Sequence, residues 1–389
     1  MNPNIEALYR IAGNHERTII GLMSGTSLDG LDIAICKIAG SGKDTKINVT
    51  HHTTIPYDSA FKAAIAQIFS IKSVNLEQVT LLHAQIARVH ASMVLSALTN
   101  WNIQPANVDL IASHGQTIYH APTFLHPQSE YGNATLQIGD GDILSVATGI
   151  ITISDFRQKH IAAGGEGAPL ALFGDTILFS SETEHRILLN MGGIANFTYL
   201  PAGQTTNIIS TDVGPANTLI DSYVKVNYNG LSYDANGEIA STGNINEAFV
   251  NAVLAHPFFS AGFPKTIGPE LFNLAFIEAA CKSAGIATMT HPDMIASLSY
   301  ITARVIADGI KQVVGDTNKD LVIYASGGGI HNAYIMQQLQ NLCPNATFKN
   351  LETLGVHPDA KEAVLFAILA NEAVAGSPTL SMGKISFPR

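Results

Sequence analysis

Small, hydroxyl-bearing and acidic residues interrupt two apolar runs near the N-terminus. The segment Ser24–Gly30 (SGTSLDG) separates Thr18–Met23 from Leu31–Ile38, which have the β-branched and aliphatic composition of strands. Small residues allow backbone N–H groups to approach an anion, and hydroxyl groups add donors. Because Asp29 and Asp32 are acidic, a phosphate bound here needs a bridging cation. For this loop alone, a polar hairpin turn without a ligand is an equally weighted alternative.

Three further glycine-rich segments lie in the second half of the chain. Asn190–Asn196 (NMGGIAN) is a second glycine turn, Asp212–Asn217 (DVGPAN) is expected to end a strand and open a helix, and Ser326–Gly329 (SGGG) precedes another helix. A helix N-terminus offers backbone donors to an anion. Four such loops in two halves predict a nucleotide held in a cleft between two domains. No GxxxxGK[ST] sequence and no GxGxxG after the first strand are present, which excludes a P-loop and a Rossmann dehydrogenase.

Asp155 is the strongest candidate for a general base. It follows the apolar run Gly149–Ser154 and precedes the glycine-rich segment Gly164–Leu170 (GGEGAPL). A carboxylate at the carboxyl end of a strand is well placed to accept a proton from a bound reactant. The structural alternatives are a helix N-cap and an ion pair with Arg157.

A second polar group is expected at the end of the strand Val108–Ser113. The segment His114–Thr117 (HGQT) offers an imidazole, an amide and a hydroxyl, which can bind sugar hydroxyls and an acetamido group. A structural histidine is an equally weighted alternative. The other histidines have no HExxH or Cys/His spacing, so we expect no zinc site.

The expected elements form two similar α/β halves, each with a hairpin and a glycine turn. The first hairpin gains a third strand at Ile47–Ile55, and the second joins Arg186–Met191 to Ala195–Leu200. We expect domain boundaries at 1–183 plus 358–389 and at 184–357, with the last helix crossing back to the first domain. A further strand is expected at Leu321–Ala325. Helices are expected at Ala60–Ile71, Leu76–Leu98, Ala216–Val226, Glu247–Ala255, Glu270–Ala284, Ser297–Val314, Asn332–Leu339 and Asp359–Val374.

The composition limits the class of protein. The 389 residues are 46% hydrophobic and 13% charged, which suffices for two globular domains. A formal net charge of -10 without a Lys or Arg block predicts no nucleic-acid partner and no membrane partner. Cys36, Cys281 and Cys343 have no CxxC spacing and indicate reduced thiols. No signal peptide or membrane span is visible, so we expect a cytoplasmic protein.

In combination, these segments resemble the anhydro-N-acetylmuramic acid kinase family of bacterial cell-wall (peptidoglycan) recycling over nearly the whole chain. The resemblance implies a two-domain actin-like (ribonuclease H-like) ATPase fold of the actin, hexokinase and heat-shock ATPase superfamily. It also implies that ATP and Mg²⁺ bind in the interdomain cleft. The segments that carry it are Gly21–Asp32, His114–Thr117, Asp155–Arg157, Gly164–Leu170, Asn190–Asn196, Asp212–Asn217, Ser326–Asn332 and Asp359–Ala363.

The resemblance also implies residue roles. Asp155 would be the catalytic base, Glu362 a second catalytic carboxylate, and Asp29 a ligand of Mg²⁺. Substrate contacts would come from His114, Gln116, Thr117, Gly165 and Gly167. Nucleotide contacts would come from Gly25, Thr26, Ser27, Leu28, Asp29, Gly30, Leu31, Asp32, Asn190, Gly192, Gly193, Asn196, Asp212, Gly214, Asn217, Gly327, Gly328, Gly329 and Asn332.

Three positions depart from the family pattern. His160 stands where an Asp is usual, Glu166 replaces a Gln, and Pro269 occupies the position of an Arg. A lost Arg near a sugar or phosphate weakens binding. These departures bear on the sugar preference more than on the reaction type.

The implied reaction opens the 1,6-anhydro bond of an amino sugar, phosphorylates O6, and yields N-acetylmuramic acid 6-phosphate and ADP. Two alternatives stay open at this point: a hydroxyl kinase for a related amino sugar, and a non-catalytic ATP-binding switch of the same fold. The expected partner is a small amino-sugar substrate. Assembly as a homodimer is also left open.

Overall fold

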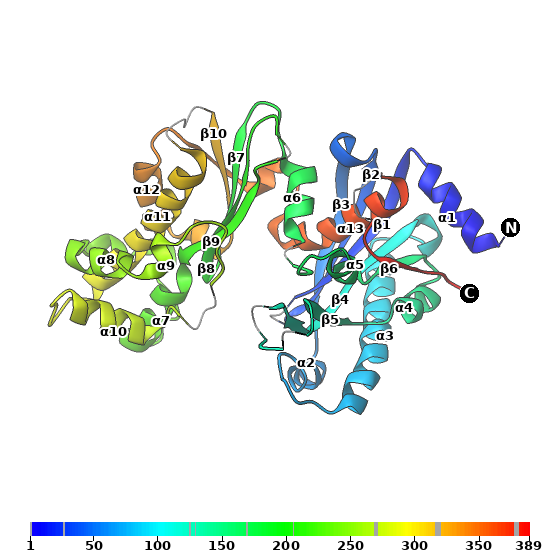
Figure 1. The fold of residues 1–389 in the computed structure, drawn as a ribbon, viewed down its shortest axis with the longest axis horizontal. Coiled ribbons are helices and arrows are strands. Elements are labelled where there is room, and N and C mark those ends of the chain that lie inside the picture. Colours follow the sequence, from blue (N-terminus) through cyan, green and yellow to red (C-terminus); the bar gives the residue numbers. More distant parts are fainter. Residues whose placement is uncertain are drawn as a thin grey trace. The chain divides into compact units, whose positions relative to one another are not determined.

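The chain divides into two compact units, each built around its own sheet (Figure 1). Unit 1 comprises Met1–Leu178 and Gly355–Arg389, and unit 2 comprises Phe179–Leu354. The computed structural model describes residues 2–25, 28–123, 126–128, 130–168, 170–204, 206–267, 271–315, 320–376 and 381–389.

Unit 1 is centred on a mixed sheet with the order β12-β6-β4-β1-β2-β3, and β5 pairs with β4. Strands β1, β2 and β3 are antiparallel neighbours, whereas β4 runs parallel to β1, and β6 parallel to β4. The strands are β1 (Glu16–Ser24), β2 (Gly30–Ala39), β3 (Lys46–Pro56), β4 (Leu110–Ala121), β5 (Ala134–Ile138), β6 (Thr152–Ser154) and β12 (Lys384–Ser386). The helices are α1 (Pro3–Gly13), α2 (Ser59–Ala66), α3 (Leu76–Asn100), α4 (Gly141–Thr148), α5 (Phe156–Ala162), α6 (Ala171–Phe179), which ends at the unit boundary, and α13 (Lys361–Ala375).

The five-stranded sheet of unit 2, with the order β11-β10-β7-β8-β9, repeats the β6-β4-β1-β2-β3 part of the unit 1 sheet. Strands β7, β8 and β9 are antiparallel neighbours, β10 runs parallel to β7, and β11 parallel to β10. The strands are β7 (His185–Met191), β8 (Ile194–Leu200), β9 (Ile209–Pro215), β10 (Leu321–Ser326) and β11 (Thr347–Asn350). The helices are α7 (Asn217–Asn227), α8 (Glu247–Leu254), α9 (Pro257–Ser260), α10 (Leu274–Ser283), α11 (His291–Val314) and α12 (Ala333–Leu342).

The predicted α/β class and both predicted hairpins are confirmed. In each unit, three antiparallel strands are followed by two that run parallel to the first. This shared order confirms the duplication of architecture that the sequence indicated. The last helix, α13, belongs to unit 1.

Close packing of α13 on β1 depends on Gly21. A Cβ atom at Gly21 would lie 1.8 Å from the carbonyl oxygen of Ala363 in α13, so only glycine allows this approach. Nearly the whole of α13 is buried from Ala363 to Glu372. Helix α11 plays the corresponding part in unit 2, where Ile295, Leu298 and Ile306 contribute to the core.

Two strands are longer than predicted. The expected strand end at His114 is wrong, because β4 continues to Ala121. Gly115, with φ 74°, lets the strand bend where it leaves β1 and begins to pair with β5. The expected strand end at Asp212 is also wrong, because β9 continues to Pro215 through its pairing with β8.

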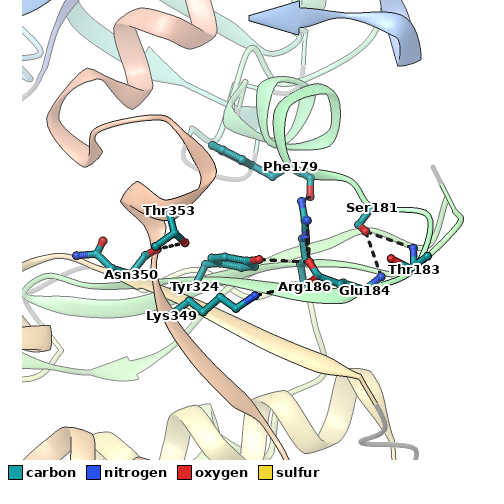
Figure 2. A network of polar contacts seen from close by, with 9 residues as sticks. All are labelled: Phe179, Ser181, Thr183, Glu184, Arg186, Tyr324, Lys349, Asn350 and Thr353. Carbon is teal, nitrogen blue, oxygen red and sulfur yellow. Dashed lines mark hydrogen bonds and ion pairs between the residues drawn. The ribbon is translucent and has the colours of Figure 1, made fainter. Parts of the chain in front are cut away.

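A charged network ties the first residues of unit 2 to the start of β7 (Figure 2). Arg186 donates from Nη1 to the carbonyl oxygen of Phe179 at 2.8 Å, and from Nη2 and Nε to the single oxygen Oε2 of Glu184 at 2.7 and 2.9 Å. Tyr324 donates to the same carboxylate at 3.2 Å, and Lys349 lies 3.7 Å from it. The hydrogen bonds from Arg186 are the main reason that the pKa of Glu184 is lowered.

Candidate functional site

Asp155 lies directly after β6 in a left-handed backbone conformation, with φ 58° and ψ 37°. Among the described residues, its side chain makes no capping hydrogen bond to α5, and the Arg157 guanidinium donates elsewhere. Neither structural alternative for this carboxylate is therefore present. A non-glycine residue in this region of φ/ψ space is strained, and such residues cluster at active sites.

The charge partner of Asp155 is Lys384, whose Nζ lies 2.8 Å from Oδ2. Strand β12 pairs antiparallel with β6 and places Lys384 opposite Ser154. Gly383 makes this approach possible, since a Cβ there would lie 2.4 Å from Ile153 Cγ2. Sequence reasoning did not find Lys384, because no local pattern indicates a strand pair between the C-terminus and β6.

His114 is a buried anchor for Arg157. Its Nδ1 lies 2.9 Å from the carbonyl oxygen of Gly115, to which it can only donate, and Nε2 accepts from Arg157 Nε at 2.8 Å. Burial, followed by the neighbouring Arg157 charge, lowers the pKa of His114 to about 3, so the imidazole is neutral. Arg157 also donates from Nη1 to the carbonyl oxygen of Gly167 at 2.9 Å. Both ring nitrogens of His114 are thus occupied within unit 1.

The glycine-rich loop after α5 is held by His160. Its Nδ1 accepts from the backbone N–H of Gly167 at 3.2 Å. A Cβ at Gly165 would lie 2.2 Å from the His160 ring, and the carbonyl oxygen of Gly165 accepts from Asn133 Nδ2 at 3.2 Å. The histidine at the usual Asp position therefore still supplies a hydrogen-bond acceptor to the loop. Glu166 is exposed.

Phe366 connects α13 to these residues. Its ring centroid lies 4.9 Å from that of His114 and 5.3 Å from that of Phe156. Glu362 precedes Phe366 by four residues and therefore shares its face of the helix.

Acidic groups of unit 1 influence one another's ionisation. The side chain of Glu362 is accessible, but protein atoms surround its carboxylate. The resulting desolvation, followed by repulsion from Asp32, raises the pKa of Glu362, while the charge of Arg157 acts in the opposite direction. Burial is also the main reason that the pKa of Asp32 is raised, and the charges of Asp29 and Asp359 add to it. Excess negative charge therefore accumulates beside the candidate phosphate loop.

The candidate phosphate loop is anchored at both ends. Thr26 and Ser27 lie outside the described residues. Leu28, with φ 56°, donates its N–H to the carbonyl oxygen of Gly25 at 3.4 Å, and the carbonyl oxygen of Asp29 accepts from the N–H of Tyr57 at 3.2 Å. A Cβ at Gly30 would lie 2.4 Å from the carbonyl oxygen of Ile55 in β3. Leu31 is completely buried, so only its backbone could reach a ligand.

Gln116 holds the first residues of this loop by hydrogen bonds. It is completely buried, and its Oε1 accepts from Ser24 Oγ. Its Nε2 donates to the carbonyl oxygens of Gly25 and Thr117 at 3.3 and 3.2 Å. Its amide is thus fully engaged inside unit 1, and Thr117 Oγ1 accepts from Gln137 Nε2 at 3.3 Å.

The structure brings the three glycine-rich segments of unit 2 together. The backbone N–H of Asn217 donates to the carbonyl oxygen of Gly192 at 3.1 Å, and its side chain donates to Met191 O at 3.3 Å. Gly327, with φ 84°, approaches the same turn so closely that a Cβ would lie 2.7 Å from both Asn190 Oδ1 and Met191 O. The carbonyl groups of the turn thus satisfy the first donors of α7, including that of Thr218.

A pocket of about 400 Å³ adjoins these segments within unit 2, a size in the range of small-molecule sites. Asn332, whose Oδ1 accepts from Ile335 N and so caps α12, is part of its wall. The sequence had indicated three of the lining residues as nucleotide contacts, and of the other six only His331 lies in a segment that carries the family resemblance. The lining residues are Asn217, Gly328, Asn332, Ile220, Asp221, Tyr233, Asp234, Asn236 and His331.

Eight other expected nucleotide contacts of unit 2 are not among the lining residues, and Asp212, Gly214 and Asn196 are three of them. Asp212 accepts from the backbone N–H of Ile267 at 2.8 Å, and burial raises its pKa. Gly214 permits helix packing, since a Cβ there would lie 2.8 Å from Val305 Cγ2. Asn196 lies in β8 opposite Asp212.

Neither metal clusters nor membrane-crossing helices are found in the described parts of the chain. No group of three or more His, Cys, Asp or Glu side chains there is arranged to hold a metal ion. None of the described helices is long and apolar enough to cross a membrane.

Comparison with known proteins gives full-length matches. The model of the anhydro-N-acetylmuramic acid kinase family matches residues 17–383. The chain is 50% identical to the anhydro-N-acetylmuramic acid kinase of Pseudoalteromonas atlantica and 51% identical to that of Pseudoalteromonas translucida, and both alignments cover 100% of each chain. A solved activator of the 2-hydroxyisocaproyl-CoA dehydratase from Clostridium difficile, with bound ADPNP, is similar with a TM-score of 0.40 and 12% identity, covering 92% of this chain and 95% of that chain.

Proposed function

Because the chain belongs to the anhydro-N-acetylmuramic acid kinase family, we propose that it phosphorylates O6 of 1,6-anhydro-N-acetylmuramic acid with ATP while water opens the anhydro bond. The products are N-acetylmuramic acid 6-phosphate and ADP, and the role is murein recycling. The full-length identity of 50% to such a kinase is the observation that carries this proposal. The repeated sheet topology agrees with the actin-like ATPase fold that the family implies.

Asp155 is the proposed catalytic base. It removes a proton from the water molecule that attacks C1, and a C1–O bond forms. The C1–O6 bond breaks, its electron pair remains on O6, and O6 forms a bond to the γ-phosphorus as ADP leaves. This assignment is supported by the carboxylate at the end of β6, which is bound by Lys384 and not used as a helix cap.

Arg157 and Glu362 are proposed to shape the site beside Asp155. Arg157 is fixed by His114 and by the carbonyl oxygen of Gly167, so its charge has a defined position. A fixed cation costs little reorganisation when negative charge develops during the reaction. We propose that His114 acts on the substrate through Arg157, and that the Gly165–Gly167 segment contacts the sugar.

Two segments are proposed to bind different parts of ATP. The pocket lined by Asn217, Gly328 and Asn332 would receive the adenosine part. The Gly25–Gly30 loop would hold phosphate oxygens through backbone N–H groups. Because Gly192 and Gly193 bind the first N–H groups of α7, they support the pocket wall more than they contact phosphate.

Mg²⁺ is part of the proposal, with Asp29 as its protein ligand. Carboxylate oxygens suit this ion, which commonly takes one or two of them together with substrate phosphates. The repulsion that helps to raise the pKa of Asp32 would be relieved by a cation beside Asp29. When bound, Mg²⁺ would neutralise charge on the phosphates. Asp29→Asn should raise the Mg²⁺ concentration needed for half-maximal ATP binding in calorimetric titrations.

Incubation with ATP, the anhydro-sugar and ¹⁸O-labelled water tests the reaction directly. The proposed reaction places ¹⁸O at C1 of the phosphorylated product, and mass spectrometry of the fragment ions locates it. Because the anomeric oxygen of a free sugar exchanges with water, the product must be analysed at early times and beside an exchange control. Phosphorylation of an ordinary amino-sugar hydroxyl without ring opening would favour the hydroxyl-kinase alternative.

ATP binding without sugar-dependent turnover would favour the switch alternative.

We also propose a cytoplasmic location, where ATP is available, and a homodimer as the assembly. Cell fractionation and light scattering test these two points.

A further inference from the structure

Four buried polar side chains form a continuous chain of hydrogen bonds beneath the Gly25–Gly30 loop. His90 Nε2 lies 2.7 Å from the hydroxyl of Tyr57, which donates to Ser24 Oγ at 2.7 Å. Ser24 donates in turn to Gln116 Oε1. All four side chains are at most 4% exposed, although they come from four different segments of unit 1.

The direction of every hydrogen bond in this chain is determined. The Gln116 amide oxygen can only accept, so Ser24 uses its proton there, and Tyr57 uses its proton on Ser24. His90 must therefore donate from Nε2 to Tyr57. The chain ends where Gln116 Nε2 donates to the carbonyl oxygen of Gly25, the first peptide of the loop.

The buried groups hold their protons. Burial lowers the pKa of His90 to about 4, so its ring is neutral near pH 7. Burial also raises the pKa of the Tyr57 hydroxyl. A neutral chain with fixed proton positions can fix geometry but does not carry a proton to the site.

We propose that Tyr57 and His90 are positioning residues that set the affinity of the Gly25–Gly30 loop for the phosphates of ATP. They act through Ser24 and Gln116, which hold the Gly25 peptide, while Tyr57 also donates its backbone N–H to Asp29 O at 3.2 Å. Tyr57 thus forms hydrogen bonds at both ends of the loop, with Ser24 and with Asp29. The inference rests on the proposed role of this loop in nucleotide binding.

Tyr57→Phe removes the hydroxyl and little else, and the chain contains a matched control. Tyr199 OH lies 2.8 Å from His185 Nδ1 in unit 2, and its ring stacks on that histidine at 6.0 Å, as Tyr57 stacks on His90 at 6.1 Å. Tyr199→Phe therefore removes a comparable hydroxyl–histidine contact but does not touch the loop.

We expect Tyr57→Phe to raise the KM and the dissociation constant for ATP by about three- to tenfold, the effect of one lost hydrogen bond. The kcat should change by less than about twofold, and Tyr199→Phe should leave ATP binding unchanged. His90→Leu should resemble Tyr57→Phe, whereas His90→Gln, which keeps a donor, should recover part of the affinity.

Equal effects of Tyr57→Phe and Tyr199→Phe on ATP binding would overturn the inference. A loss of kcat at constant ATP affinity would also overturn it. If the wild-type protein binds ATP in calorimetric titrations but does not phosphorylate the anhydro-sugar, the proposed function fails. In that case the dissociation constants of Tyr57→Phe and Tyr199→Phe for ATP still test the positioning role of Tyr57.

Discussion

The candidate sites of the two units are built from different kinds of side chain. In unit 1, the carboxylate of Asp155 is bound by Lys384, and the charge of Arg157 acts on the carboxylate of Glu362. In unit 2, glycines and asparagine amides meet at the ends of β7 and β10. Both arrangements occur on sheets that share the same order of five strands.

We infer from this difference that the two units have different roles. Groups that change charge can move protons and stabilise developing charge, whereas neutral amides and tightly packed glycines can shape a binding surface at any pH. Substitutions of the charged side chains Asp155 and Glu362 should therefore change kcat and its pH dependence. Substitutions in the glycine turns of unit 2 should change ATP affinity.

The largest effect is expected for Asp155→Asn. Loss of the base should lower kcat by about 10²–10⁴ while the dissociation constant for ATP stays close to wild type. Lys384→Met is the matched control, because it removes the ion pair but keeps the carboxylate, and it should cost no more than about tenfold. Steady-state kinetics and calorimetry measure both quantities. Turnover close to wild type in Asp155→Asn would refute the assignment of the base.

Glu362→Gln should lower kcat by about ten- to a hundredfold and change the pH dependence of stability. Since the folded-state pKa of Glu362 is raised, the wild type loses stability as pH rises from the unfolded value through the folded value. The variant lacks this loss, so its unfolding free energy should exceed that of the wild type near neutral pH. The difference should vanish in acid.

Urea unfolding at several pH values measures this effect. A variant that is less stable than the wild type at every pH would contradict the idea that Glu362 is held in an unfavourable charged state.

Gly328→Val should weaken ATP binding by about tenfold, equivalent to ~1.4 kcal/mol. A Cβ at Gly328 has Asn217 Nδ2 at 3.8 Å as its nearest contact, so the valine fits and projects at the pocket wall. Gly327→Val is the matched comparison, because φ 84° and contacts at 2.7 Å make a side chain there strained. The first variant should keep the wild-type unfolding temperature, and the second should not. Unchanged ATP affinity in Gly328→Val would exclude this pocket as the nucleotide site.

Local patterns in the sequence predicted much of the fold. Alternating and apolar runs indicated both hairpins, and the end of β6 before Asp155 was indicated by a run of apolar residues. Glycine clusters marked turns that the structure brings together in unit 2. These features are local because backbone conformation and burial of a single strand depend on neighbouring residues.

Local patterns could not predict contacts between residues that are far apart in the sequence. Lys384 reaches Asp155 across 229 positions of sequence, and Tyr57 meets His90 only because α3 packs on the sheet. The course of β4 through His114 depends on its partner β5, which the sequence did not indicate. A side chain's role in the site thus followed from tertiary pairing more than from its own motif.

The smallest effect is expected for the charged network at the start of β7 in unit 2. Glu184→Gln should lower the unfolding free energy by no more than about 1 kcal/mol, because the carboxylate is partly solvent-accessible and its ion pairs are screened. The pKa of Glu184 is lowered, so its contribution is present above the unfolded pKa and is lost as pH falls through the folded pKa. The wild-type and variant unfolding curves should therefore converge in acid and at high salt, while kcat and ATP affinity stay unchanged at neutral pH. This network is charged but lies apart from the glycine turns. The variant therefore tests whether ATP affinity depends on the turns themselves or on any loss of charge in unit 2. A change in ATP affinity of the size expected for Gly328→Val would contradict the assignment of nucleotide binding to the neutral turns.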